Sequence, residues 1–162
     1  MEKGLPFEGE VTLKDPGFKN LAVYELSRGG LVDFTRKGGV VRVPVKSETT
    51  DGRLFVFAEQ KIAKVELEAK IQGEGEERTG SRSLHVEMKV LGEDGRPMKG
   101  LWPVEVCVKD AAGNRIDGLD YGCAVDGVFT ASVPLNLNDA KGAYTVVARD
   151  RASGISKRIA VR

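Results

Sequence analysis

The chain has 162 residues, of which 41% are hydrophobic and 30% charged, and its formal net charge at pH 7 is +1. This composition is typical of a soluble globular protein with one large or two small domains. Basic and acidic residues balance in both halves, so no nucleic-acid-binding surface is expected. A run of about 18 apolar residues is missing, so no membrane insertion is expected either.

The first ten residues, MEKGLPFEGE, lack the basic and then apolar pattern of a secretory signal. We therefore expect either a cytosolic chain or a piece of a longer exported protein.

Short strand patterns follow one another through the first third of the chain. Val11 and Leu13 indicate a first strand, and alternating patterns follow at 21–26, 31–35, 40–46 and 53–59. Turn residues recur every 8 to 12 residues or so, which is typical of all-β proteins. Pro44 inside one of these patterns predicts an edge strand or a bulge.

A domain boundary is expected at residues 60–62. The next segment, 62–72, is rich in helix formers, but its alternation after a one-residue offset at Ile62 favours a strand. Six more strand patterns follow, at 84–91, 102–109, 122–125, 128–135, 143–150 and 155–161. Seven strands in about 100 residues are typical of an immunoglobulin-like sandwich. We predict an all-β fold in which a small antiparallel β-domain, 1–61, precedes an immunoglobulin-like β-sandwich, 62–162.

Tyr144 opens the penultimate predicted strand. In immunoglobulin-like sandwiches a tyrosine at this place packs inward and its hydroxyl bonds back to the preceding loop. The alternative is a tyrosine that stacks on a ligand. Val146 stands where antibody domains have a cysteine, so the antibody-type disulfide is not expected.

Cys107 and Cys123 are the only two cysteines. They lie in neighbouring strand patterns, so a disulfide between them is one alternative if the compartment is oxidising. Two cysteines without clustered histidines do not predict a zinc site.

Several motifs resemble a known family. In the first part these are Val23–Leu26 with Gly29 or Gly30, Val43–Val45, Asp51–Phe55 and Glu59–Ile62. In the second part they are Val90–Pro97, Gly142–Val146 with Asp150, and Ser153–Gly154. Together they resemble the C-terminal β-domain and the following immunoglobulin-like domain of large bacterial glycoside-hydrolase-like proteins of the β-galactosidase type. The resemblance covers about residues 20–162, and Glu59 replaces the proline that usually opens its fourth motif.

The resemblance implies a non-catalytic accessory and support module pair of a larger protein. Its partners would be the missing domains of that parent chain, and an extracellular or periplasmic location would follow. No catalytic residue carries over, because the paired carboxylates of such enzymes lie in a barrel that this sequence does not contain. No cofactor or metal site is predicted, and we expect the chain not to be an enzyme by itself.

The alternative function is a carbohydrate-binding or adhesive β-sandwich module. Trp102 and Tyr121 are the candidate carbohydrate-binding residues, because coplanar aromatic rings stack on sugars. Trp102 shares a face with Val104 and Val106, however, so packing in the core is the competing interpretation.

Other residues with chemical potential have simpler interpretations. His85 alternates onto the outer face of its strand, as a solvated histidine does. Carboxylates at Glu66, Glu68, Glu74, Glu76 and Glu77 are numerous, as on many soluble β-surfaces, although glycosidases require two carboxylates facing one another. The loop from Asp110 to Asp120 has oxygens for Ca²⁺, but without EF-hand spacing, and its Asp and Asn are ordinary turn residues.

Overall fold

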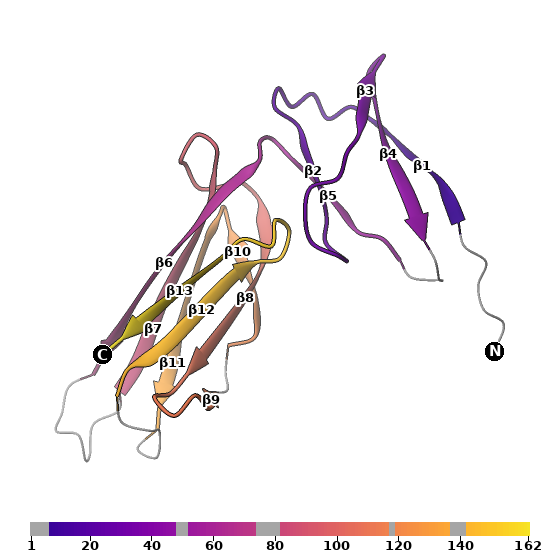
Figure 1. Cartoon of the computed structure of the whole chain (residues 1–162). Coiled ribbons are helices and arrows are strands. Elements are labelled where there is room, and N and C mark those ends of the chain that lie inside the picture. The colour runs from indigo at the N-terminus through magenta and orange to yellow at the C-terminus, as the bar shows by residue number, and fades with distance from the viewer. Residues whose placement is uncertain (1–6, 48–51, 74–81, 117–118, 137–141) are drawn as a thin grey trace, which may run out of the picture. The chain divides into compact units, whose positions relative to one another are not determined.

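The computed structural model describes residues 7–47, 52–73, 82–116, 119–136 and 142–162, and these ranges contain strands and irregular segments but no helix. The chain divides into two compact units, Met1–Lys61 and Ile62–Arg162, at the place where the sequence predicts the boundary (Figure 1). No helix long and apolar enough to cross a membrane occurs in the described ranges.

The first unit contains two small antiparallel sheets. One has the order β1-β4-β3, and the other pairs β2 with β5. The strands are β1 (Phe7–Lys14), β2 (Ala22–Glu25), β3 (Thr35–Lys37), β4 (Val40–Ser47) and β5 (Phe55–Ala58). Leu21, Val23, Val41 and Val43 form the buried core, and aromatic side chains such as Phe55 and Phe57 pack against it.

The predicted strand at 31–35 is mostly a connecting segment. Leu31 forms an isolated bridge with Tyr24, and β3 begins only at Thr35. Between these points Val32 and Phe34 pack against the core, so an alternation that looks like a strand reflects side-chain burial in an irregular segment.

Pro44 lies beyond the end of the β3 pairing, which stops at Arg42. There β4 pairs only with β1, Pro44 lying opposite Glu10, so on its other side β4 is locally an edge. This placement fits the edge position predicted for a residue without a backbone N–H.

The second unit is one antiparallel sheet with the strand order β13-β12-β8-β10-β11-β7-β6, to which β9 is added by pairing with β8. The end strands β6 and β13 contact each other, so the sheet curls back on itself and nearly closes (Figure 1). Its strands are β6 (Ile62–Gln72), β7 (Arg82–Gly92), β8 (Leu101–Lys109), β9 (Arg115–Ile116), β10 (Tyr121–Val125), β11 (Val128–Leu135), β12 (Tyr144–Asp150) and β13 (Ser156–Val161).

Strict alternation builds the core of this unit. Successive side chains of a strand point to opposite faces of the sheet, and every second residue of β7, β8 and β12 is buried. The segment 62–72 is a strand, as its alternation predicts, and the offset after Ile62 is a register shift against β7 between Ile62 and Lys64.

A two-residue turn, Asp126–Gly127, joins β10 to β11. Asp126 has φ of 47° and Gly127 has φ of 74°, as the type I′ hairpin turn requires. The carbonyl of Gly127 accepts a hydrogen bond from Val90 N at 2.8 Å, and the Asp126 carboxylate accepts one from Gly100 N at 3.0 Å. The turn therefore joins the ends of four strands.

Gly127→Ala tests this junction. A Cβ at residue 127 would lie 2.6 Å from Met98 N and 2.9 Å from Val90 O, both backbone atoms. Left-handed strain costs about 1–2 kcal/mol and overpacking about 1–3 kcal/mol. We therefore expect a loss of about 3 kcal/mol in the free energy of unfolding, measured in urea. Gly95 has φ of 75° and open space around it, so the control Gly95→Ala should lose only about 1 kcal/mol. Equal losses would contradict this role of Gly127.

Candidate functional site

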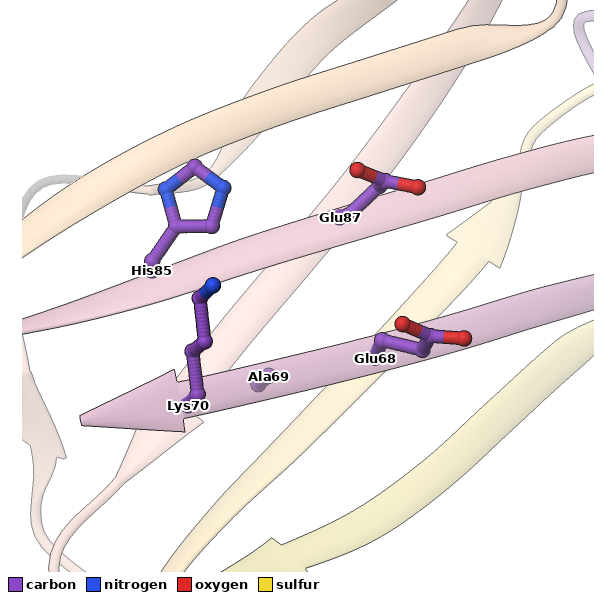
Figure 2. A pocket seen from close by; sticks show the side chains of 5 residues that line it. All are labelled: Glu68, Ala69, Lys70, His85 and Glu87. Atoms are coloured by element: carbon purple, nitrogen blue, oxygen red, sulfur yellow. The ribbon is translucent and has the colours of Figure 1, made fainter. Parts of the chain in front are cut away.

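A shallow hollow of about 150 Å³ lies on the outer face of the β6–β7 hairpin. Five residues line it, and Figure 2 shows the four charged or titratable ones projecting to the same side of the two strands. Alternation in the two strands places them there, since Leu67 of β6 and Val86 of β7 point into the core. The lining residues are Glu68, Ala69, Lys70, His85 and Glu87.

The register of the hairpin decides which charges are neighbours. Glu68 lies directly opposite Glu87, and Lys70 lies opposite His85. Within β7, Lys89 Nζ lies 2.9 Å from Glu87 Oε1. The hydrogen bond from Lys89 and its positive charge lower the pKa of Glu87, and the same bond raises the pKa of Lys89.

A second ion pair continues the pattern along β6. Lys64 Nζ lies 2.6 Å from Glu66 Oε1 and, through its hydrogen bond, lowers the pKa of Glu66. The outer face of the hairpin is therefore a ladder of exposed acidic and basic groups in which the lysines compensate the carboxylates.

This arrangement has little binding capacity. Pockets for small ligands usually measure about 300–1,000 Å³, so the hollow is too small and open to enclose a sugar ring. In the part of the chain that the structure describes, no three His, Cys, Asp or Glu side chains come together to hold a metal ion. Glu74, Glu76 and Glu77 lie outside the described residues.

Trp102 and Tyr121 lie on opposite faces of their sheet. Trp102 is 3% exposed and pairs with Ala124, whereas Tyr121 is 76% exposed and pairs with Glu105. The indole Nε1 of Trp102 donates a hydrogen bond to the carbonyl of Lys99 at 3.0 Å. The two rings therefore cannot form the predicted stacking platform, and Trp102 packs in the core.

The predicted neighbours Cys107 and Cys123 are both free thiols. Cys123 lies opposite Pro103, four positions from Cys107 along β8. Four strand residues span about 13 Å, whereas a disulfide requires Cα atoms within about 7 Å. The register thus excludes a bond between these cysteines.

The Asp110 side chain organises its own turn. Its Oδ1 accepts hydrogen bonds from the backbone N–H groups of Ala112 and Asn114, and its Oδ2 accepts one from the Asn114 amide at 3.1 Å. This is the ordinary turn role of an aspartate. Asp117, a further oxygen donor considered for Ca²⁺, lies outside the described residues.

Asp150 is a fully buried carboxylate at the end of β12. Its Oδ2 accepts hydrogen bonds from Ser153 N at 2.6 Å and Ser153 Oγ at 2.5 Å, while its Oδ1 is buried without a hydrogen-bonding protein group. Burial raises the pKa of Asp150 and outweighs the bonds from Ser153, which lower it. The carboxyl group thus stabilises the β12–β13 turn through its hydrogen bonds to Ser153, while its burial disfavours the charged form.

Sequence reasoning places His85 and Glu68 outward but does not bring the cluster of charges together. Neighbours across a hairpin depend on its register, and here a bulge shifts that register by one residue. The burial of Asp150 was also missed, because an aspartate before a turn is usually solvated. The chain matches no protein-family model, and no curated protein matches it significantly.

Asp150→Asn tests the cost of the buried charge. Since the folded pKa is raised, the stabilising contribution of Asp150 is fully present below its unfolded value near 3.8 and is lost as pH rises through the folded value. Asparagine does not ionise, so we expect the variant to gain stability relative to wild type as pH rises from acid to neutral. Urea unfolding at several pH values measures this difference.

The control for this comparison is Asp33→Asn, which removes the same charge from an exposed position. A stability difference between Asp150→Asn and wild type that does not change with pH, or that falls toward neutral pH, would contradict the raised pKa.

Proposed function

We propose that this chain is a non-catalytic module pair that supports further domains of a larger glycoside-hydrolase-like protein. The observation that carries the proposal is the apolar face of the β1–β4 sheet. Val11 and Leu13 of β1 lie beside Val43 and Val41 of β4. The two β4 valines are fully buried, but Val11 and Leu13 are each 37% exposed.

The first unit is small for an independent domain. Domains of about 60 residues bury a smaller fraction of their surface than larger domains do and are marginal alone. In this unit Phe7, Leu31 and Leu54 are also more than half exposed. An uncovered apolar face that continues a core is the kind of surface that another domain covers.

The second unit supports the immunoglobulin-like part of the proposal through its strand order. If β6, β7, β8, β11, β12 and β13 are equated with strands A, B, C, E, F and G, then A-B-E and G-F-C are adjacent sets, as in that fold. In this scheme β10 joins the two sets, and Tyr144, at the start of β12, is buried.

The charged hairpin fits a solvated surface of such a module. Glycosidase carboxylates face each other across a sugar, whereas Glu68 and Glu87 project side by side from neighbouring strands (Figure 2).

A carbohydrate-binding or adhesive module is the second candidate, and the exposure of Tyr121 favours it. Around this ring the outer face of β8 and β10 is partly apolar, because Leu101 and Val125 lie opposite each other and are 68% and 59% exposed. A single ring could stack on a sugar even though Trp102 is buried.

The apolar face predicts how the chain binds a hydrophobic dye. We expect Val11→Ser with Leu13→Ser to lower the fluorescence of an added anilinonaphthalene dye at least twofold, because dye binding follows exposed apolar area. Glu10→Ser with Thr12→Ser changes the opposite face of the same strand and should have no such effect. Equal fluorescence in the two double variants would contradict the exposed docking face.

Titration calorimetry against a panel of polysaccharides separates the two functions. The support function predicts no saturable heat of binding for wild type or for Tyr121→Ala. Saturable binding that is lost in a folded Tyr121→Ala protein would replace the support function with the carbohydrate-binding one.

A further inference from the structure

The strand β1 has a long open edge. It is the end strand of the order β1-β4-β3, so its other side faces no strand of its own sheet. The opposite end strand, β3, has three residues, and the end strands β6 and β13 of the second unit contact each other. Among the described strands of the first unit, β1 therefore has the longest edge free to pair with another strand.

Two common protections of an edge, a bulge and a proline, are missing from β1. Its eight residues pair with β4 in an unbroken register, so no bulge twists the edge away. None of the eight is proline. One face of the strand is apolar, and the Phe7 ring covers Gly9 so closely that a Cβ there would lie 2.5 Å from Phe7 Cζ. An edge with these properties tends to pair with another strand.

The charges of β1 are self-complementary. The face opposite the apolar one carries Glu8, Glu10, Thr12 and Lys14. If two copies of β1 pair antiparallel about Val11, Glu8 of each copy lies opposite Lys14 of the other. The same register places Val11 opposite Val11 and Gly9 opposite Leu13, so the apolar faces also coincide.

Backbone geometry restricts the other registers. Every second residue of β1 directs its backbone N–H and C=O toward the free edge. In an antiparallel pair of identical strands these residues must lie opposite one another to form hydrogen bonds, so one residue lies opposite its own copy at the symmetry axis. An axis at Glu10 sets two glutamates against each other, which is destabilising. An axis at Thr12 leaves Glu8 opposite Pro16, outside the strand, and shortens the pairing. An axis at Val11 therefore gives the longest pairing in which Glu8 and Lys14 of the two copies lie opposite each other.

We propose that the chain forms a symmetric dimer in which the β1 strands of two copies pair antiparallel about Val11. The two three-stranded sheets then become one six-stranded sheet. This goes beyond the support function, because it uses the backbone edge of β1 and leaves the apolar face available to another domain.

Charge reversal tests the proposed register by sedimentation equilibrium over a range of concentrations. Glu8→Lys places two lysines opposite each other at both ends of the interface, and Lys14→Glu places two glutamates there. Each single variant should raise the dimer dissociation constant about tenfold, because repulsion replaces attraction at two exposed charge pairs. The double variant Glu8→Lys with Lys14→Glu should restore it.

Mixing the two single variants gives a second readout. A heterodimer of Glu8→Lys with Lys14→Glu has opposite charges at both ends, so the mixture should associate more tightly than either variant alone. Glu8→Lys also breaks the exposed pair between Glu8 and Lys46, whose atoms lie 2.9 Å apart. Lys14→Glu leaves that pair intact, so agreement between the two variants identifies the contact between copies.

Glu10→Lys is the matched control. About Val11 this residue faces Thr12 of the second copy, so the dissociation constant should change less than twofold. Tenfold changes in both Glu10→Lys and Lys14→Glu, with no change in Glu8→Lys, would identify the Thr12 axis, about which Glu10 faces Lys14, and would overturn the proposed register.

Val11→Cys, in a background where Cys107 and Cys123 are serine, should form a disulfide between copies under mild oxidation, because residues at the axis lie about 5 Å apart. A chain that stays monomeric at millimolar concentration, or a dimer insensitive to both charge reversals, would overturn the proposal. Neither outcome would alter the dye-binding test of the apolar face.

Discussion

The turn at Asp126–Gly127 is the constraint on which the second unit depends. Two consecutive residues with positive φ set the register of β10 against β11, and only glycine fits where Gly127 approaches the backbone of Met98 and Val90. A slip of one residue would turn every buried side chain of the hairpin toward solvent. The same turn is hydrogen-bonded to Val90 and Gly100, so it also links the last part of β7 to the start of β8.

Alternation made much of this fold predictable. Each pattern predicted after residue 61 corresponds to an observed strand within about two residues, because half-buried strands record burial directly in their sequence. The segment 31–35 was less predictable, since Val32 and Phe34 are partly buried against the core without a ladder of strand pairs. Helix propensity alone would predict a helix at 62–72. The segment is a strand because one of its faces is buried, and only the alternation of its side chains indicates that burial.

The candidate sites were less predictable, because they depend on which residues meet. Trp102 and Tyr121 are close in the strand pairing but face opposite sides of the sheet. Glu68 and Glu87 become neighbours only through a register that includes a bulge. The burial of Asp150 depends on packing at the end of β12, which no local pattern indicates. The outer face of β6 and β7 is a compensated charge ladder. The strand β1 has one exposed apolar face and a free backbone edge, and we place the association of two copies at that edge.

Hydrogen exchange of the β1 amides as a function of protein concentration tests this placement most directly. Amides of β1 that bond to β4 are protected at every concentration, whereas those on the free edge are open in a monomer. If β1 pairs with a second copy, the free-edge amides become protected as concentration rises through the dimer dissociation constant, and Lys14→Glu shifts this rise to higher concentration. Exchange at the free edge that stays fast and independent of concentration would show that β1 does not pair with a second copy.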